Sequence, residues 1–202
     1  MTRTLYYSQR SPFARKVRIF LLEKNLDCEL KAIEVMKQPP EFLQMSPIGK
    51  IPVFIDTDET IIWDSTLITE YLDETYPEPS FYPLDKKQKL ECRKWEEIAD
   101  TLCDNTIALW LQNNMADSPQ VRLVNRYQSV ITRLLNALEQ KLTNSTYIVG
   151  ENFTAADIAT ISFLGYYNLR FGSDWQTQYP HLLKLFNDLH EMESVKSTIP
   201  QG

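Results

Sequence analysis

The sequence has few of the residues on which metal binding and histidine-based catalysis depend. Only two histidines occur, His181 and His190, and neither has a cysteine or an acidic cluster at a metal-ligand spacing. A zinc site and a Ser-His-Asp triad are therefore disfavoured, and no metal is expected. The three cysteines, Cys28, Cys92 and Cys103, form no Cys-x-x-Cys pair, so we expect reduced thiols in a cytoplasmic protein.

Long apolar runs and basic clusters are missing as well. No uninterrupted apolar stretch is long enough to span a bilayer, and residues 1–10 lack the basic and apolar regions of a signal peptide. The 21 Lys and Arg residues are outnumbered by 27 Asp and Glu, which gives a net charge of −6 and argues against a broad nucleic-acid surface. A local basic pocket for a small anion stays open. We predict a cytoplasmic protein without a membrane or nucleic-acid partner.

The first part of the chain alternates between strand and helix patterns. Residues 4–7 are rich in β-formers, and Val17, Phe20 and Leu21 recur at helical spacing after Pro12. The pattern predicts strands over 4–7, 28–35, 52–55 and 60–63, helices over 13–23 and 64–76, and a short helical turn from 39. A parallel β-α-β unit, a turn and a β-β-α unit make a mixed four-stranded sheet covered by helices. We assign it to a domain over residues 1–78.

The pattern changes at a linker that contains Pro77, Pro79 and Pro83, and no convincing strand follows it. From Val124, apolar residues keep steps of three and four, which is a strong amphipathic signal. Helices are predicted over 86–114, from 124, from near 154 and over 180–192. We therefore predict an all-helical bundle as the second domain, over residues 85–202.

The turn from the first strand into the first helix carries a motif. It reads Tyr7-Ser8-Gln9-Arg10-Ser11-Pro12-Phe13-Ala14-Arg15. This resembles the soluble glutathione transferases of the serine type, in a bacterial and plant-like branch, whose catalytic serine precedes Pro-Phe and is followed four residues later by Arg. The resemblance implies that Ser11 stabilises the thiolate of glutathione by a hydrogen bond, at a helix N-terminus that also favours an anion. An unperturbed thiol has a pKa of about 8.5, so this help raises the reactive fraction near neutrality.

Ser11 has a structural alternative and three competitors. A serine ahead of a proline at the first helical position is a common N-cap, and a cap hydroxyl points into the same space as a catalytic one. Tyr6, Tyr7 and Ser8 are the other candidates, since other branches of the family use a tyrosine at the end of the first strand. The spacing to Arg15 favours Ser11, then Tyr7, then Ser8. No cysteine stands here, which disfavours the thiol-transferase branch.

The segment 46–54 resembles the family loop that holds the cysteinyl part of glutathione. The resemblance implies two backbone hydrogen bonds from Ile51 and a cis peptide bond before Pro52, although roughly 5% of such bonds in folded proteins are cis. The alternative is a proline that merely opens an edge strand. Lys50 and Lys37 are candidates for binding the glycine carboxylate of glutathione, although most lysines are simply solvated.

Asp64-Ser65 follows Trp63 where the family usually has Glu-Ser or Gln-Ser, the pair that binds the γ-glutamyl group. One of the two residues is expected to cap a helix whose free N–H groups bind the glutamyl carboxylate, while the acid pairs with the ammonium group. An ordinary N-cap is the alternative. Because aspartate is shorter than glutamate, the distance over which Asp64 reaches toward the ammonium group is left open.

The helical half contains a capping box, Thr154-x-x-Asp157, which the family also carries and which implies no chemistry. The resemblance places the second substrate between the domains, over Ser11. Candidate walls of this electrophile site, each of which can equally be core or surface, are Phe13, Trp110, Met115, Tyr166 and Phe171.

The four segments span nearly the whole chain, and their order is more specific than any one of them. The resemblance implies an α+β fold, with a thioredoxin-like N-terminal domain and an all-helical C-terminal domain, that forms a homodimer. It implies glutathione as co-substrate, without a metal, and transfer of glutathione to small hydrophobic electrophiles in detoxification. Peroxidase, isomerase and dehalogenase activities are variants. The alternative from another class is a glutathione-transferase-like binding or interaction protein without turnover, because the scaffold is reused in non-enzymes.

Overall fold

The first half of the chain folds around a four-stranded sheet. The computed structural model describes residues 2–37 and 39–202. The strand order is β2-β1-β3-β4, with β1 and β2 parallel and the other two pairs antiparallel. The bounds are β1 Arg3–Tyr7, β2 Cys28–Ala32, β3 Val53–Ile55 and β4 Ile61–Trp63. The predicted mixed sheet is confirmed, although its second strand is shorter than 28–35 because a one-turn helix, η1 (Val35–Lys37), follows it.

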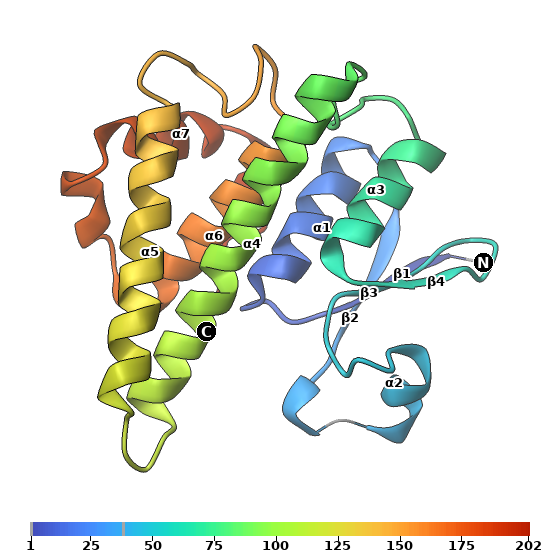
Figure 1. Ribbon diagram of the computed structural model, residues 1–202. Coiled ribbons are helices and arrows are strands. Elements are labelled where there is room, and N and C mark those ends of the chain that lie inside the picture. Colours follow the sequence, from blue (N-terminus) through green and yellow to red (C-terminus); the bar gives the residue numbers. More distant parts are fainter. Residues whose placement is uncertain (1, 38) are drawn as a thin grey trace.

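Helices cover both faces of this sheet (Figure 1). α1 (Pro12–Glu23) and α3 (Ser65–Thr75) pack side by side on one face, and the short α2 (Pro40–Met45) lies on the other. Tyr6 of β1 faces α2, where its ring centroid lies 6.4 Å from that of Phe42. Each of α1 and α2 begins at a proline, a residue whose missing N–H has no partner to lose in a first helical turn.

Residues 79–202 contain helices and no strand. The bounds are α4 Lys86–Asn114, α5 Val121–Lys141, α6 Ala155–Phe171, η2 Asp174–Thr177, α7 Pro180–Leu189 and α8 Glu193–Lys196. The helix predicted over 86–114 is confirmed at both ends. The one predicted over 180–192 ends earlier, and η2 and α8 were missed because four residues are too few to show a helical period. Within residues 2–37 and 39–202, no helix combines the length and hydropathy needed to cross a membrane.

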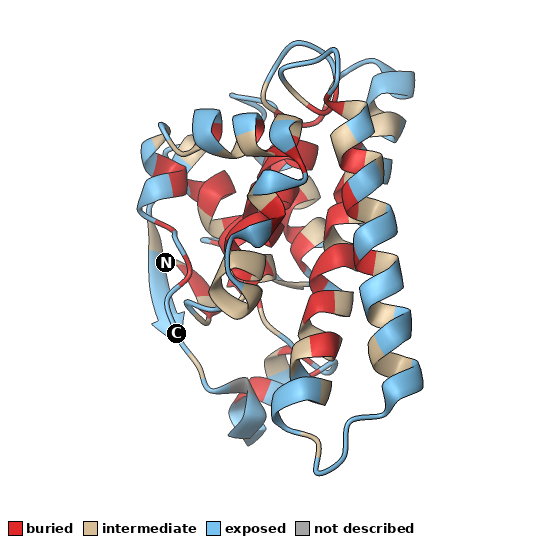
Figure 2. Ribbon diagram, turned by 90° about the vertical axis from the view of Figure 1, so that its left-hand side faces the viewer, coloured by how far each residue is buried: buried red, intermediate tan, exposed pale blue. Residues whose placement is uncertain are grey.

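α6 is the core of the helical half (Figure 2). Every residue from Ala155 to Tyr166 is buried, and the exposed faces of the surrounding helices point outward. The capping box at its start is confirmed: the Asp157 carboxylate accepts hydrogen bonds from the backbone N–H (2.9 Å) and the hydroxyl (2.8 Å) of Thr154. It also accepts the N–H of Ile148 at 2.8 Å, so one buried acid fixes both the helix start and the loop before it.

Arg15 ties α1 to the helical half. Its guanidinium is fully buried and donates to the carbonyl oxygens of Ile161 (3.0 Å) and Val195 (3.1 Å) and to the hydroxyl of Thr198 (3.3 Å). Residue 165 has to be glycine, because a Cβ there would collide with this guanidinium. The C-terminal segment is thereby held against the first helix of the sheet domain.

Lys16, the next residue, makes a second buried link. Its Nζ lies 2.7 Å from Asp100 Oδ2 and 3.0 Å from Glu96 Oε1, and it donates to the Thr66 hydroxyl at 3.0 Å. Burial disfavours the charged amine, but the two carboxylates hold its pKa above the ordinary value. We call Lys16, Thr66, Glu96 and Asp100 the Lys16 network; it joins α1, α3 and α4.

Candidate functional site

Three of the predicted segments meet at one end of the sheet. Val53 of β3 is paired with Tyr6 of β1 and with Trp63 of β4. Because both pairings are antiparallel, Pro52 lies level with Tyr7, the last residue of β1, and Asp64 follows β4 at the same end. The sheet register therefore brings together the loop before α1, the Ile51-Pro52 segment and the start of α3.

Ser11 is the N-cap of α1. Its half-buried hydroxyl accepts the N–H of Ala14 at 3.2 Å, and its own N–H donates to the Ser8 carbonyl oxygen at 3.1 Å. The hydroxyl uses a lone pair for the cap and can still donate its proton. A cap and a thiolate donor are therefore compatible roles for this one side chain.

The competitors of Ser11 are placed differently. The Tyr7 ring is 9% exposed and packs in the core, with the Arg18 guanidinium 5.2 Å from its centroid. The Tyr6 ring faces α2 on the opposite side of the sheet. The Ser8 hydroxyl accepts the N–H of Arg10 at 3.4 Å within the loop. Of these four side chains, only that of Ser11 caps a helix.

The loop before β3 is held in a defined shape. The bond between Ile51 and Pro52 is cis, as predicted; a second cis bond, Glu78-Pro79, was not predicted. The buried Ser46 hydroxyl donates to the Lys50 carbonyl oxygen at 3.0 Å. This leaves Ile51 half-buried at the sheet end, next to the cis bond.

Asp64 is the residue that caps α3. It has a φ of 77°, and its carboxylate accepts the N–H groups of Thr66 (2.9 Å) and Leu67 (3.2 Å). Two of the N–H groups expected for a ligand are therefore occupied by Asp64 itself. The backbone N–H of Ser65, which is buried at the first helical position, is the donor that stays available for a carboxylate.

The two candidate lysines differ. Lys37 pairs with Glu34 at 2.7 Å on the exposed surface, and no described contact brings it to another predicted site residue. Lys50 lies close enough to Asp104 of α4 to act on its pKa. Burial raises the pKa of Asp104, the charge of Lys50 opposes the rise, and the charges of Asp100 and Asp64 add to it.

Asp100 and Asp104 are two acids near this end of the sheet that the sequence analysis did not single out. The charges of Lys50, Asp100 and Asp64 all act on Asp104, and a group of carboxylates suits an ammonium group. A signal was available: Glu96, Asp100 and Asp104 recur every four residues on α4, and like charges at that spacing destabilise a helix unless cations face them. The Lys16 network supplies one such cation.

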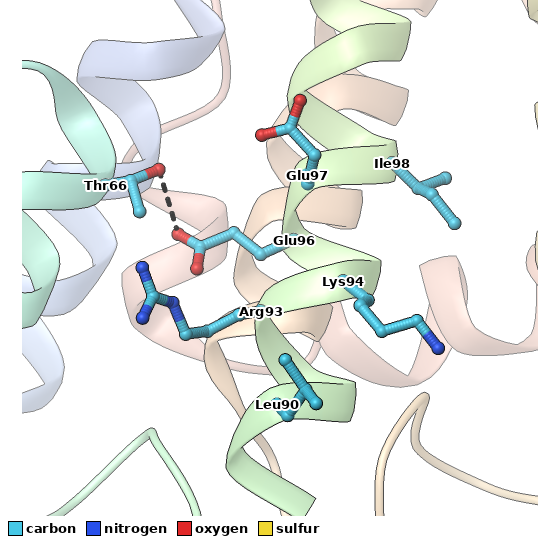
Figure 3. Close-up of a pocket in the computed structure, with 7 residues that line it drawn as sticks. All are labelled: Thr66, Leu90, Arg93, Lys94, Glu96, Glu97 and Ile98. Carbon is cyan, nitrogen blue, oxygen red and sulfur yellow. Dashed lines mark hydrogen bonds between the residues drawn. The ribbon is translucent and has the colours of Figure 1, made fainter.

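A surface hollow between α3 and α4 lies next to the same network (Figure 3). Its lining is Thr66, Leu90, Arg93, Lys94, Glu96, Glu97 and Ile98. The Thr66 hydroxyl donates to Glu96 at 3.5 Å inside it. None of the predicted site residues belongs to this lining, so the hollow is not the predicted glutathione site.

The candidate electrophile walls are only partly brought together. Trp110 and Tyr166 both lie near Arg170, whose guanidinium carbon is 4.1 Å from the Trp110 ring centroid and 5.2 Å from that of Tyr166. Phe13 is half-buried against the core, and Met115 is exposed at the C-cap of α4. The Phe171 ring stacks on Tyr167 at 5.3 Å.

Neither the cysteines nor the acids form a competing centre among the described residues. Burial raises the pKa of Cys28 to about 12 and of Cys92 to about 11, and it raises that of Cys103 well above the usual range. These thiols stay protonated at neutral pH and do not supply a nucleophile. Residues 2–37 and 39–202 contain no group of three or more His, Cys, Asp or Glu side chains arranged to hold a metal.

Comparisons with known proteins agree with this geometry. The N-terminal domain model of glutathione S-transferases matches residues 5–80, and the C-terminal domain model matches residues 116–193. The chain is 31% identical over 195 residues to the uncharacterized GST-like protein YibF of Escherichia coli (strain K12), with 96% of both chains covered. It is 28% identical over 155 residues to elongation factor 1-gamma 2 of Oryza sativa subsp. japonica, which covers 75% of this chain and 37% of that protein.

A solved structure is similar over the full length. The glutathione S-transferase from Methylobacillus flagellatus KT with GSH bound has a TM-score of 0.93 and 33% identity, over 99% of this chain and 100% of that one. The sheet, the helical half and their order therefore all have a counterpart in one protein. Taken with the two family models and the 31% identity to YibF, this shows that the chain belongs to the glutathione S-transferase family.

Proposed function

We propose that this protein is a glutathione transferase in which Ser11 activates the thiol. The observation that carries the proposal is the convergence of the Ser11 cap, the cis Ile51-Pro52 loop and the Asp64-Ser65 helix start at one end of the sheet. The glutathione-bound relative from Methylobacillus flagellatus, similar over its whole length, supports the same ligand here.

Each part of glutathione has a partner in this arrangement. The Ile51 backbone holds the cysteinyl part in an extended pose, and the Ser65 N–H receives the glutamyl carboxylate. Asp64 and Asp104 face the ammonium group, with Lys50 beside them for the glycine carboxylate. Lys37 is the weaker of the two lysine candidates because Glu34 already pairs with it.

The chemistry is a nucleophilic substitution. The thiol proton goes to solvent, and the thiolate, stabilised by the Ser11 hydroxyl and the start of α1, attacks an electrophilic carbon. A carbon–sulfur bond forms while the bond to the leaving group breaks, and a halide, for example, departs with the bonding electrons. No residue of the protein is consumed, and glutathione is the co-substrate.

Ser11→Ala tests the proposal. Loss of one hydrogen bond to a charged group should lower kcat/KM for an aryl chloride by about 10- to 100-fold. The kcat/KM profile should also shift to higher pH, because the thiolate loses a donor and its pKa rises. Glutathione affinity, measured by calorimetry, should change less than about threefold, since one hydrogen bond among many is lost. Ser129→Ala, on an exposed face of α5, is the matched control.

The other outcomes separate the alternatives. A larger loss of kcat/KM in Ser8→Ala or Tyr7→Phe than in Ser11→Ala would assign activation of the thiol to that residue instead. Glutathione binding without turnover of aryl halides, isothiocyanates or hydroperoxides would favour a binding protein, a reading that the likeness to elongation factor 1-gamma 2 supports. No binding of glutathione would refute both. Action in the cytoplasm, a role in detoxification and a homodimeric assembly are further parts of the proposal, taken from the family resemblance.

A further inference from the structure

Arg170 is a cation that packs against aromatic rings of the helical half. It lies near the C-terminal end of α6, and its guanidinium stacks on the Trp110 ring of α4. The side chain is half-buried, and its Nε is shielded from solvent without a hydrogen-bond partner among the described residues. No carboxylate in residues 2–37 and 39–202 lies within ion-pair distance of it. A donor that is shielded from water and has no acceptor lowers the stability of the fold, and an acceptor on a bound ligand would remove this cost.

Arg10 approaches the same region from the sheet domain. It directly precedes Ser11. Burial raises the pKa of Tyr166, a hydrogen bond with Arg170 and the charge of Arg170 oppose this rise, and the charge of Arg10 opposes it as well. A Cβ at Gly202 would lie 3.1 Å from Arg10 Cδ and 3.5 Å from Leu169 Cδ1, so residue 202 bridges the loop and the end of α6. Two arginines from different domains therefore approach Tyr166, and one of them directly precedes the residue proposed to activate the thiol.

The charge around these arginines is not compensated by the described residues. Glu34 is the acid whose titration responds to Arg10, but its pKa is lowered first by Lys37, with which it pairs at 2.7 Å. Arg10 itself forms no ion pair in the part of the chain that the structure describes. In a protein with a net charge of −6, this local excess of positive charge is an exception.

The guanidinium carbon of Arg170 lies over the Trp110 ring, 4.1 Å from its centroid. The N–H donors of the group lie along the edge of the guanidinium plane. A planar guanidinium edge matches the two oxygens of a carboxylate. The half-buried ring of Trp110 stands beside it and offers an apolar surface to the rest of such a ligand, and the buried ring of Tyr166 lies close to the guanidinium.

We propose that the electrophile carries a carboxylate on an aromatic or similarly apolar body, bound by the edge of Arg170 with Arg10 assisting and Trp110 and Tyr166 alongside. This inference rests on the proposed transferase function and narrows its second substrate from small hydrophobic electrophiles to acidic ones. Arg170 and Arg10 then set specificity, while Ser11 acts on the thiol.

The site is tested directly by the binding of two compounds that do not react and that differ only in whether they carry a free carboxylate. Dinitrobenzoate and its methyl ester lack a leaving group, so their affinities can be measured by calorimetry on the full chain with glutathione present. The acid should bind about 10- to 100-fold more tightly than the ester, as a charge-assisted pair predicts, and added salt should reduce the preference. Arg170→Met should bring the ratio of the two affinities close to one. Arg170→Lys should retain part of it, and Arg10→Gln should lower it less.

Arg126→Gln, which removes an exposed arginine from α5, should keep the wild-type ratio. Melting temperature and glutathione affinity of Arg170→Met check that the variant is folded, and Arg10→Gln, on an exposed side chain, provides a second test if it is not. Equal binding of acid and ester by the wild type would overturn the inference. An unchanged ratio in both arginine variants would overturn it as well.

Turnover separates this inference from the transferase proposal. Chlorodinitrobenzoate and its methyl ester are both open to attack by the thiolate with loss of chloride. Each rate is divided by the uncatalysed rate with glutathione. If both are turned over with equal enhancement, the transferase proposal holds and the acidic substrate class is wrong. If neither is turned over but the acid still binds preferentially through Arg170, the anion site stands and the transferase proposal fails.

Discussion

At the scale of single residues, two acids of the helical half have different surroundings, and we expect one to contribute to stability and the other to ligand binding. Asp157 is fully buried and its carboxylate accepts three hydrogen bonds from Ile148 and Thr154. Asp104 is only partly withdrawn from water, and the charges of Lys50 and of two other acids act on its pKa. We therefore assign Asp157 to the fold and propose Asp104 as a residue of the ligand site.

Asp157→Asn should lower the free energy of unfolding by about 1–3 kcal/mol at neutral pH, because an amide cannot accept all three donors. Glutathione affinity should stay within about twofold, since the residue lies in the capping box of α6. Urea unfolding and calorimetry measure the two quantities. Asp117→Asn, on an exposed loop, is the control and should change neither. A loss of affinity without a loss of stability would contradict this assignment.

The same variant has a pH signature. Burial raises the pKa of Asp157 from 3.8 to about 6, although the three donors oppose the rise. A folded-state pKa above the ordinary value means that the folded protein binds this proton more tightly, so its contribution to stability is present below about pH 4 and is lost as the pH rises to about 6. Asp157→Asn cannot titrate. Its deficit relative to wild type should therefore be larger at pH 4 than at pH 7, by about 3 kcal/mol. An equal deficit at both pH values would mean that the carboxylate stays ionised.

Sequence motifs located the residues whose role depends on the local backbone. A cap at Ser11 was one of its two predicted roles, a cap was expected at Asp64 or Ser65, and Pro52 was predicted as a cis proline; the structure has Ser11 and Asp64 as caps and Pro52 cis. Asp100 and Arg170 were not singled out, because their roles depend on partners from other helices. Sequence spacing reports neighbours along one helix and does not report which distant helix faces them.

At the scale of elements, the Lys16 network decides how α1, α3 and α4 pack. Lys16→Met should lower the free energy of unfolding by about 3–5 kcal/mol, because Glu96 and Asp100 would be left as like charges without their buried cation. Adding Glu96→Gln should recover part of the loss by removing one of those charges. Both are measured by urea unfolding.

Lys94 is an exposed lysine of α4 that pairs with Glu91. Lys94→Met should lower the free energy of unfolding by less than about 1 kcal/mol. If Lys16→Met lowers the free energy of unfolding no more than this control does, the carboxylates of the Lys16 network do not need the amine to be buried stably.

Element boundaries show where sequence reasoning works and where it stops. The long α4 was predicted to the residue from apolar residues that recur on one stripe, and the structure adds the Asp85 cap at its start. The second strand was predicted too long, because the alternation of Cys28 to Val35 continues past the residues that pair with β1. The domain limits, 1–78 and 85–202, stay predictions.

At the scale of the whole molecule, buried contacts cross the domain boundary. Arg15 and Lys16 of α1 both reach into the helical half, and α1 packs directly against α6. We therefore expect a single unfolding transition rather than one for each half. Calorimetry should give equal calorimetric and van't Hoff enthalpies, and the fluorescence of a variant that keeps only Trp63 should follow the same curve as the helical signal. An earlier change at Trp63 would show that the sheet domain unfolds by itself.

The buried guanidinium of Arg15 also bears on how such proteins can be recombined. Its three acceptors, at Ile161, Val195 and Thr198, belong to the helical half, and two of them are backbone carbonyls that no side-chain exchange can supply. A chimera that grafts the helices of another family member onto this sheet domain would keep the cation but change the backbone that receives it. Exchange of domains should therefore succeed only between members that share these backbone acceptors for the Arg15 guanidinium and a glycine at position 165, which leaves space for the guanidinium.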